Sequence, residues 1–502
     1  MRILAAALLF LTTALADEPA RLVVLHTNDL HGQLRPLPPS PVGPIRRLRG
    51  KSVGGFAHLA ALVRTTRKEV AQDGGFVLLL DGGDLFSGTP IGNESRGDAV
   101  VDAMNALGYD AIAVGNHEFD YGLKNMLRLA ERSRFPWLAA NMSGRRRPFR
   151  QIKPYVVLVP PRVPCRVAVI GLITPSTPYI TTPNLGDSVR FADPIGTTRS
   201  LLEQIDADLY ILLTHLGYSE DRKLAEACPE LALIVGGHSH TAMSSTTNGV
   251  RIVQTRGKGI TLGRVTFDLD KKTWKVLDVR AGKTPIDPSA TDPDPAVQRV
   301  IQDYEKNLGV KLQRVLGKLT APLRRNRSFF TSTAGNWMSD VIRKAGGAQI
   351  GFMNKGGIRC DLEAGEIIFE DIYRLMPFDN TIVSMDLTGA QVRGIARQAL
   401  KPGRYPGLEW SGIEIEASKR GSGFEIVAIR VAGKPLEDKK TYRVATNSFV
   451  AAGGDGYAWF KQGRNTKKSG RLLRDVLAEA LSADSPVTPP RDSRLLVVEK
   501  AR

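Results

Sequence analysis

The sequence predicts an α/β protein of two domains. From about residue 20 to 285, short apolar runs alternate with stretches of helical spacing such as 56–68 and 124–132, as in an α/β sandwich. Four prolines lie close together at 285–295, and further predicted strands and helices follow. A length of 502 residues with 42% hydrophobic residues allows at least two full cores.

The N-terminus predicts a secretory signal peptide over residues 1–16. One arginine precedes an apolar stretch of about 12 residues, which ends in a small-x-small pattern at Ala16. That stretch is too short for a stable membrane anchor, and no later segment reaches the roughly 18 consecutive apolar residues of a spanning helix. We therefore expect a mature protein in the periplasm or outside the cell, with no transmembrane segment.

Five apolar runs of the first domain each end in polar residues of the kinds that bind metals. In chain order these residues are Asp29 and His31, then Asp84, then Asn116 and His117, then His215, and finally His238 and His240. All-apolar runs are typical of strands buried on both faces, and ligands of open α/β sheets bind beyond the carboxyl ends of the strands. We expect the five groups to converge at one edge of one sheet.

A mixed set of imidazole, carboxylate and amide groups fits two borderline divalent cations, with zinc or manganese favoured over magnesium or cobalt. Two ions about 3.5 to 4 Å apart need a bridging carboxylate, and Asp84 is the candidate because it lies centrally in the order of strands. Each histidine taken alone is more often a hydrogen-bonded structural residue. The joint pattern favours a dinuclear metal site.

Several motifs resemble those of the bacterial and animal 5′-nucleotidases, which are dinuclear metallophosphoesterases. They are Thr-Asn-Asp-Leu-His-Gly at 27–32, Gly-Asp-Leu-Phe-Ser-Gly-Thr-Pro at 83–90, Gly-Asn-His-Glu-Phe-Asp-Tyr-Gly at 115–122 and Gly-His-Ser-His at 237–240. The resemblance continues at 354–359, 377–380 and 453–457, and so covers nearly the whole mature chain. It implies a four-layer metallophosphoesterase sandwich over residues 20–285, a linker with a connecting helix over 286–314, and a C-terminal 5′-nucleotidase domain over 315–500.

The resemblance also implies roles for the metal-binding residues. One ion is expected on Asp29, His31, Asp84 and His240, and the other on Asp84, Asn116, His215 and His238. The matching family pair makes His117 and Asp120 a catalytic dyad, in which the histidine contacts the phosphoryl group and the aspartate orients it. The alternatives for His117 are a ninth ligand or a supporting hydrogen bond.

The second domain contains no histidine after residue 315, so we expect it to supply no imidazole ligands. The resemblance implies that it selects the leaving group. In the family, the positions of Phe378 and Phe449 stack a nucleobase, and that of Asp455 accepts from ribose hydroxyls. Asn354 and Arg359 match residues that contact the nucleotide or its phosphate. Taken alone, either phenylalanine is more often a core residue. The motif around each one is the reason for predicting a base-stacking role.

One departure from the family concerns phosphate binding. Family members place an arginine shortly before the Gly-Asn that opens a helix, whereas this chain has Ser-Phe-Phe-Thr-Ser at 328–332. Arg324, Arg325 and Arg327 lie just upstream, and each is a candidate replacement. Arg327 is the one counted among the expected substrate-binding residues.

The net charge and the cysteine count limit the kinds of partner and cross-link that the sequence predicts. A net charge of +18 comes from scattered basic clusters without aromatic platforms, so we expect a solvated surface that attracts anionic substrates, and no nucleic-acid polymer as partner. Three cysteines imply no disulfide framework.

The Pro-rich loop at 36–51 is either a surface insertion, which is favoured slightly, or a segment that shapes access to the site.

The leading hypothesis is a secreted, metal-dependent hydrolase that releases phosphate from nucleotides, with nucleotide sugars and cyclic nucleotides as further candidate substrates. A rival within the superfamily is a thiosulfohydrolase of sulfur oxidation, for which a base-stacking pair has no use. A rival of another class is a non-catalytic surface protein that keeps the fold. The intact ligand set argues against it.

Overall fold

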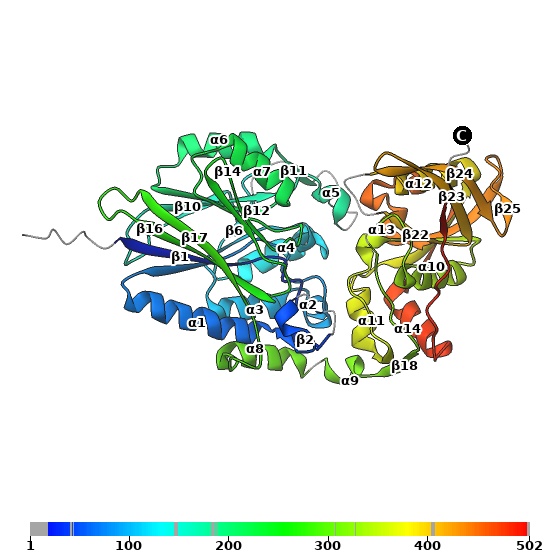
Figure 1. Ribbon diagram of the computed structural model, residues 1–502, viewed down its shortest axis with the longest axis horizontal. Helices are drawn as coiled ribbons and strands as arrows, with labels where there is room; N and C mark the ends of the chain where they lie inside the picture. The colour runs from blue at the N-terminus through cyan, green and yellow to red at the C-terminus, as the bar shows by residue number, and fades with distance from the viewer. Residues whose placement is uncertain are drawn as a thin grey trace, which may run out of the picture.

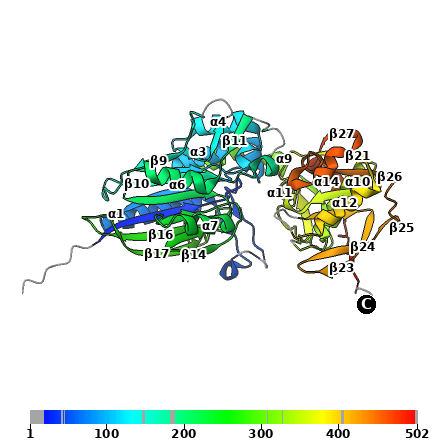
Figure 2. The ribbon, with the colours of Figure 1, turned by 90° about the horizontal axis from the view of Figure 1, so that it is seen from above.

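The computed structural model describes residues 19–40, 43, 45–144, 149–181, 185, 188–306, 308–326, 328–402 and 407–498. The predicted signal peptide and Arg327 lie outside these residues. Two lobes lie side by side and are joined at one end by α8 (Pro295–Glu305) and α9 (Gly309–Leu312) (Figures 1 and 2). None of the described helices combines the length and apolar character needed to cross a membrane.

The N-terminal lobe is built on two facing mixed sheets. The seven-stranded sheet has the order β17 (Val276–Pro285), β16 (Thr261–Leu269), β1 (Ala20–Thr27), β4 (Phe76–Asp81), β5 (Ala111–Ala113), β6 (Trp137–Leu138) and β8 (Ile152–Lys153). The six-stranded sheet has the order β14 (Met243–Thr247), β15 (Val250–Gln254), β13 (Leu233–Val235), β12 (Leu209–His215), β10 (Val167–Ile173) and β9 (Tyr155–Leu158). The strands that lead to the predicted ligands run parallel to one another within each sheet, namely β1, β4 and β5 in the first sheet and β12 and β13 in the second.

Helices cover the outer face of each sheet, which gives four layers (Figure 1). The helices on the seven-stranded sheet are α1 (Phe56–Gln72), α3 (Asp98–Leu107), α4 (Gly122–Arg132) and α8, and those on the other sheet are α6 (Pro194–Gln204) and α7 (Tyr218–Ala227). Along β1, Leu22 and Val24 face the second sheet, while Val23 and Leu25 face the helices. Burial on both faces explains why the predicted strands are apolar without alternation.

Short elements complete the N-terminal lobe. They are β2 (Pro36–Leu37), η1 (Arg46–Leu48), β3 (Val53–Gly54), α2 (Pro90–Glu94), η2 (His117–Phe119), β7 (Met142–Gly144), α5 (Thr177–Ile180) and β11 (Val189–Phe191). The predicted helices at 56–68 and 124–132 correspond to α1 and α4 and are confirmed. The connecting helix predicted within 286–314 corresponds to α8, which Asp294 caps and which has Pro295 in its first turn.

The C-terminal lobe contains a five-stranded sheet with helices on both faces. Its order is β22 (Leu408–Ser411), β19 (Ile350–Asn354), β26 (Thr441–Asn447), β21 (Thr381–Thr388) and β27 (Arg464–Leu472). One face packs against α10 (Thr333–Ala345) and α14 (Leu473–Ala483), and the other against α12 (Gly389–Ala399). The other elements are β18 (Val315–Leu319), η4 (Lys355–Gly357), β20 (Gly365–Ile368), α11 (Phe369–Leu375), β23 (Ile413–Arg420), β24 (Gly423–Val431), β25 (Lys434–Pro435), α13 (Ser448–Ala451), η5 (Gly454–Gly456), η6 (Ala458–Gln462) and β28 (Leu495–Val497).

The two lobes contact each other directly through α2 and α11. The Tyr373 hydroxyl donates to Glu94 Oε1 at 3.2 Å, and the Asn93 amide donates to the carbonyl of Pro377. Arg35 bridges Glu305 of α8 and Glu370 of α11. Between the lobes lies a cavity of about 1320 Å³, lined by residues of both.

A buried ion pair fixes the segment before α10, which lines this cavity. Lys355 Nζ lies 2.8 Å from Glu409 Oε1 and donates to the carbonyls of Asn326 and Phe330, and the two side chains are only 5% and 1% exposed. Glu409 also accepts from the amide and hydroxyl of Ser332, whose hydroxyl caps α10. Lys355 and Glu409 together therefore hold Asn326, Phe330 and Ser332 in place.

Lys355→Met should destabilise the C-terminal lobe by about 3 to 5 kcal/mol, because it leaves the Glu409 carboxylate buried without its cation. Urea unfolding monitored by tryptophan fluorescence measures the effect, with the exposed Lys344→Met on α10 as the charge-matched control. The double variant K355M/E409Q should recover more than half of the loss. A single variant as stable as the wild type would contradict the role given to this pair.

Candidate metal centre and substrate cavity

The predicted metal ligands come together from both sheets. Asp29, His31, Asp84 and Asn116 follow β1, β4 and β5 of the seven-stranded sheet, whereas His215 ends β12 and His238 and His240 follow β13 of the six-stranded sheet. The prediction of one edge of one sheet was therefore wrong. Because the sheets face each other, the ends of these strands still meet at one place.

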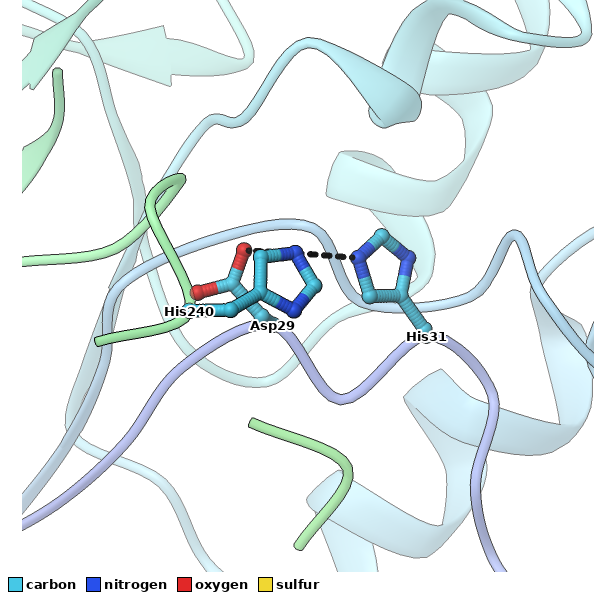
Figure 3. A group of neighbouring side chains, drawn as sticks. All are labelled: Asp29, His31 and His240. Atoms are coloured by element: carbon cyan, nitrogen blue, oxygen red, sulfur yellow. Dashed lines mark hydrogen bonds and ion pairs between the residues drawn. The ribbon is translucent and has the colours of Figure 1, made fainter. Parts of the chain in front are cut away.

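The side chains form two groups of three, and within each group the potential ligand atoms lie within 4.8 Å of one another. The first group is Asp29, His31 and His240 (Figure 3). Its His240 Nε2 lies 3.3 Å from Asp29 Oδ1 and 3.2 Å from His31 Nε2. The second group is Asp84, His215 and His238.

Asp84 reaches both groups. Its Oδ2 lies 3.1 Å from Nε2 of His215 and 3.8 Å from Nε2 of His31, and its Oδ1 accepts from the backbone amide of His117 at 2.9 Å. This is the position that a bridging carboxylate requires.

The hydrogen bonds of the ring nitrogens suit metal coordination. The Nδ1 of His31 donates to the carbonyl of Ser87 at 2.7 Å, and the Nδ1 of His215 donates to that of Gly82 at 2.7 Å. A histidine that donates from Nδ1 presents the lone pair of Nε2 toward the site. Asn116 Oδ1 is buried without a hydrogen-bond partner among the described residues. These donor atoms fit divalent cations of the borderline class.

Backbone strain is concentrated in this site. Asp29, His31, Asp84, His238 and His240 all have left-handed φ values, between 48° and 74°. Such conformations are costly for residues with a Cβ, and they persist where the surroundings determine them strongly. The close packing is visible at Gly83, where an added Cβ would lie 2.9 Å from His215 Nδ1.

Charges in the site are strongly coupled. Burial alone would lower the pKa of His215, but the carboxylates of Asp84 and Asp29 raise that pKa to about 10. Burial alone would raise the pKa of Asp84, but His215 and His117 hold it well below its usual range. The Asp84 carboxylate thus requires positive charge beside it, which protons or metal cations can provide.

Glu118 supports the loop around Asp84, a role that sequence reasoning missed. Its carboxylate accepts from the backbone amides of Asp84, Leu85 and Gly115 at 2.6 to 3.0 Å. Burial raises the pKa of Glu118 to about 7. Its place in the Gly-Asn-His-Glu motif was the available signal, but the residue lies beside the more conspicuous His117.

His117 and Asp120 form a hydrogen-bonded pair at the edge of the site. His117 Nδ1 donates to Asp120 Oδ2 at 2.8 Å, and the ring stacks on Phe378 with 5.6 Å between centroids. Burial would lower the pKa of His117, but the carboxylates of Asp120 and Asp84 raise it. His117 belongs to neither of the two ligand groups.

The C-terminal lobe contributes the other predicted residues to the same cavity, which Asn354, Arg359, Phe378, Phe449 and Asp455 all line. Arg359 Nη2 lies 3.2 Å from His31 Nε2, and its guanidinium lies 5.6 Å from the Phe378 ring centroid. Asp455 Oδ2 accepts from the Asn354 amide at 3.0 Å, and burial raises the pKa of Asp455 to about 6. The residues predicted to recognise the substrate therefore line the same cavity as Asp84, Asn116, His238 and His240.

The basic segment before α10 also reaches the cavity. Arg324 and Arg325 line it, while Arg327 lies outside the described residues. Arg324 pairs with Glu363 at 2.7 Å, and Arg325 donates to the carbonyl of Arg359 at 2.9 Å.

The loop at 36–51 forms part of the cavity wall through Leu37, Pro38, Leu48 and Lys51. The slightly favoured interpretation as a surface insertion was therefore wrong. The signal for the correct interpretation was its position directly after the first ligand motif.

Both halves of the chain match domains of known protein families. Residues 22–242 match the calcineurin-like phosphoesterase domain, and residues 315–462 match the 5′-nucleotidase C-terminal domain. Protein UshA of Salmonella pullorum is 30% identical over 528 aligned positions, which cover 94% of this chain and 92% of that protein.

Solved structures agree with this assignment. The 5′-nucleotidase precursor of Thermus thermophilus superimposes with a TM-score of 0.85 at 29% identity, covering 96% of this chain and all of that one. The sulfate thiohydrolase SoxB of the same species shares the fold, with a TM-score of 0.81 at 20% identity and coverage of 96% and 97%. With two domain matches in family order and a relative at 30% identity over nearly its full length, this chain belongs to the 5′-nucleotidase family of calcineurin-like phosphoesterases.

Proposed function

We propose that this protein is a secreted 5′-nucleotidase that releases phosphate from nucleotides with the aid of two divalent cations, zinc or manganese being the best fit to the donor set. Membership of the family makes it a phosphoric ester hydrolase. The observation that carries the proposal is the position of Asp84 Oδ2 between the histidines of two ligand groups, in a cavity that also contains Phe378 and Phe449.

The cations, when bound, lower the pKa of a water molecule and neutralise charge on the phosphoryl oxygens. Asp29, His31 and His240 would hold one of them, and Asn116, His215 and His238 would hold the other. Asp84 would contribute to both sites.

The remaining residues act on the substrate. His117, kept protonated and oriented by Asp120, stabilises negative charge that develops on the phosphoryl group. Arg359 and Asn354 bind the phosphate, since a guanidinium fork matches phosphate oxygens. Phe378 and Phe449 stack the base, and Asp455 accepts from the ribose hydroxyls.

The fold alone does not separate this function from that of a thiohydrolase, because the SoxB structure shares it. The two phenylalanines and the acid at Asp455 in one cavity favour a nucleoside leaving group over a peptide-borne sulfur group. The complete ligand set disfavours a non-catalytic surface protein. Residues 1–16 support export, so we assign the mature protein to the periplasm or the exterior of the cell.

A phosphate-release screen of the purified mature protein tests the function. AMP and other nucleoside monophosphates should be hydrolysed in the presence of manganese or zinc, whereas thiosulfate-derived substrates should not react. Sulfate release without phosphate release would replace the proposal with the thiohydrolase alternative.

Asp84→Ala should abolish phosphate release, because it removes the ligand shared by both ions. Metal analysis should show a fall from about two ions per chain to fewer than one in the variant. Dialysis of the wild type against a strong chelator should have the same effect on activity. Full activity after chelation would refute metal dependence.

His117→Ala should lower kcat by roughly 10² or more, since a charge stabiliser or general acid contributes about that much. The metal content should remain near that of the wild type, because His117 belongs to neither ligand group. Loss of an ion in this variant would reassign His117 as a ligand. Asp120→Asn serves as the matched variant and should lower kcat without loss of metal.

Arg327→Ala should raise KM for nucleoside monophosphates several-fold if Arg327 replaces the arginine that the family places before the Gly-Asn helix start. The reason is the loss of a charge-assisted hydrogen bond to a phosphate dianion. Phosphodiesters, with a single negative charge, should be affected less. Unchanged kinetics on AMP would exclude Arg327 from the phosphate site.

A further inference from the structure

Phe378 belongs to a short loop that one buried arginine holds on both sides of the ring. This loop connects α11 to β21. Arg474, in the first turn of α14, donates through Nη1 to the carbonyl of Pro377 at 3.2 Å and through Nη2 to Asp379 Oδ1 at 3.1 Å. The residues immediately before and after Phe378 are therefore bound to the same guanidinium group.

The guanidinium group of Arg474 is itself held in place. It lies over the ring of Tyr373 on α11, 3.8 Å from the ring centroid, and Arg474 is only 4% exposed. The helices α11 and α14 pack side by side around this contact (Figure 1). The backbone amide of Leu473 also donates to the carbonyl of Asn380 at 2.7 Å, so the start of α14 contacts the same loop. A planar group stacked on a ring presents its N–H donors in fixed directions.

The packing of α14 does not by itself require an arginine at this position. A buried guanidinium is costly to remove from water, and hydrogen bonds that match its fork offset that cost. The two acceptors beside Phe378 supply such bonds, whereas Arg474 Nε has no partner among the described residues. The hydrogen bonds of Arg474 therefore hold the loop and not the helix. The other buried residues of α14 are all apolar, namely Leu473, Val476, Leu477, Ala478 and Leu481.

The second ring of the base-stacking pair is fixed by a different segment. Phe449 packs against the backbone of η5, where a Cβ added at Gly454 would lie 2.4 Å from Phe449 Cε1. The separation of the two rings therefore depends on where the loop holds Phe378. A base stacks on both rings only when their separation fits it, so a displaced loop would weaken binding of the base.

We propose that Arg474 is a positioning residue for nucleobase recognition, which acts on the substrate through Phe378. Phe378 and Asp379 line the cavity, whereas Arg474 lies behind the loop and outside the described lining. The inference rests on the proposed nucleotidase function. It assigns part of the affinity for the base to a residue that does not contact the base.

Steady-state kinetics with AMP and ribose 5-phosphate test the inference, because ribose 5-phosphate offers the same phosphate and sugar without the base. Arg474→Met should raise KM for AMP about tenfold, the order of one lost stacking contact, and leave kcat within about twofold. The kinetics on ribose 5-phosphate should change less than about twofold. Arg474→Lys keeps the charge but not the fork, so its KM for AMP should lie between those of the wild type and Arg474→Met.

A binding measurement that needs neither phosphate nor metal complements the kinetics. Calorimetry with adenosine on the metal-free protein should show affinity about tenfold lower in Arg474→Met. The charge-matched control is Arg471→Met, which removes an exposed arginine of β27 that pairs with Glu479 on the surface. This control should match the wild type in adenosine affinity and in both kinetic assays.

A double-variant cycle separates positioning of the ring from a general effect on the fold. If Arg474 acts through Phe378, then Arg474→Met should change KM for AMP less than about twofold in a Phe378→Ala background. The same loss in both backgrounds would overturn the inference. Arg474→Met is expected to fold, because Asn93 still donates to the carbonyl of Pro377 and the side chain of Asp379 is 48% exposed to water. Urea midpoints of the variants check this.

The remaining outcomes separate this inference from the proposed function. Equal loss of kcat on AMP and ribose 5-phosphate would overturn the inference, since it would place the effect on His117, which stacks on Phe378. A preference for AMP that survives in Arg474→Met would overturn the inference alone. A wild type without that preference would overturn the base-stacking role as well. Asp379→Ala removes the acceptor of Nη2 and should raise KM for AMP selectively, which provides the test should Arg474→Met not fold.

Discussion

The structure depends on one buried carboxylate, that of Asp84, which lies between histidines of two different sheets. An anion in this position requires cations around it, since an uncompensated buried charge is strongly destabilising. The strand ends that deliver His31 and His215, the left-handed turns at the ligands and the amide contacts of Glu118 all serve to hold that arrangement. The two sheets therefore hold Asp84 and the surrounding histidines together as a cluster of buried charges. The chemistry of the site depends on the cations that this cluster binds.

The two lobes supply different kinds of side chain to the surroundings of Asp84. The N-terminal lobe supplies all the imidazoles, while the C-terminal lobe supplies rings, guanidinium groups and amides. The two sets touch where Phe378 stacks on His117 and Arg359 approaches His31. The residues proposed for recognition and those proposed for metal binding and catalysis are thus in direct contact. Lys355 and Glu409 extend this coupling by fixing the basic segment that lines the cavity.

Sequence reasoning identified the two-domain α/β fold, the family and the strand ends that carry the predicted ligands, because apolar runs and the motifs after them are local signals. It assigned those strands to one sheet, since β12 and β13 look no different in sequence from β1 and β4, and strand pairing is a non-local property. Glu118 was missed for a similar reason, because only the tertiary structure brings its carboxylate onto the backbone amides of Asp84, Leu85 and Gly115. The contribution of Leu37, Pro38, Leu48 and Lys51 to the cavity wall likewise became apparent only from the structure.

The most direct test of the central claim is anomalous diffraction from crystals of the protein grown with manganese. The account predicts two peaks about 3.5 to 4 Å apart, with Asp84 between them, one beside Asp29, His31 and His240 and the other beside Asn116, His215 and His238. A single peak, or two peaks that do not share Asp84, would contradict the account.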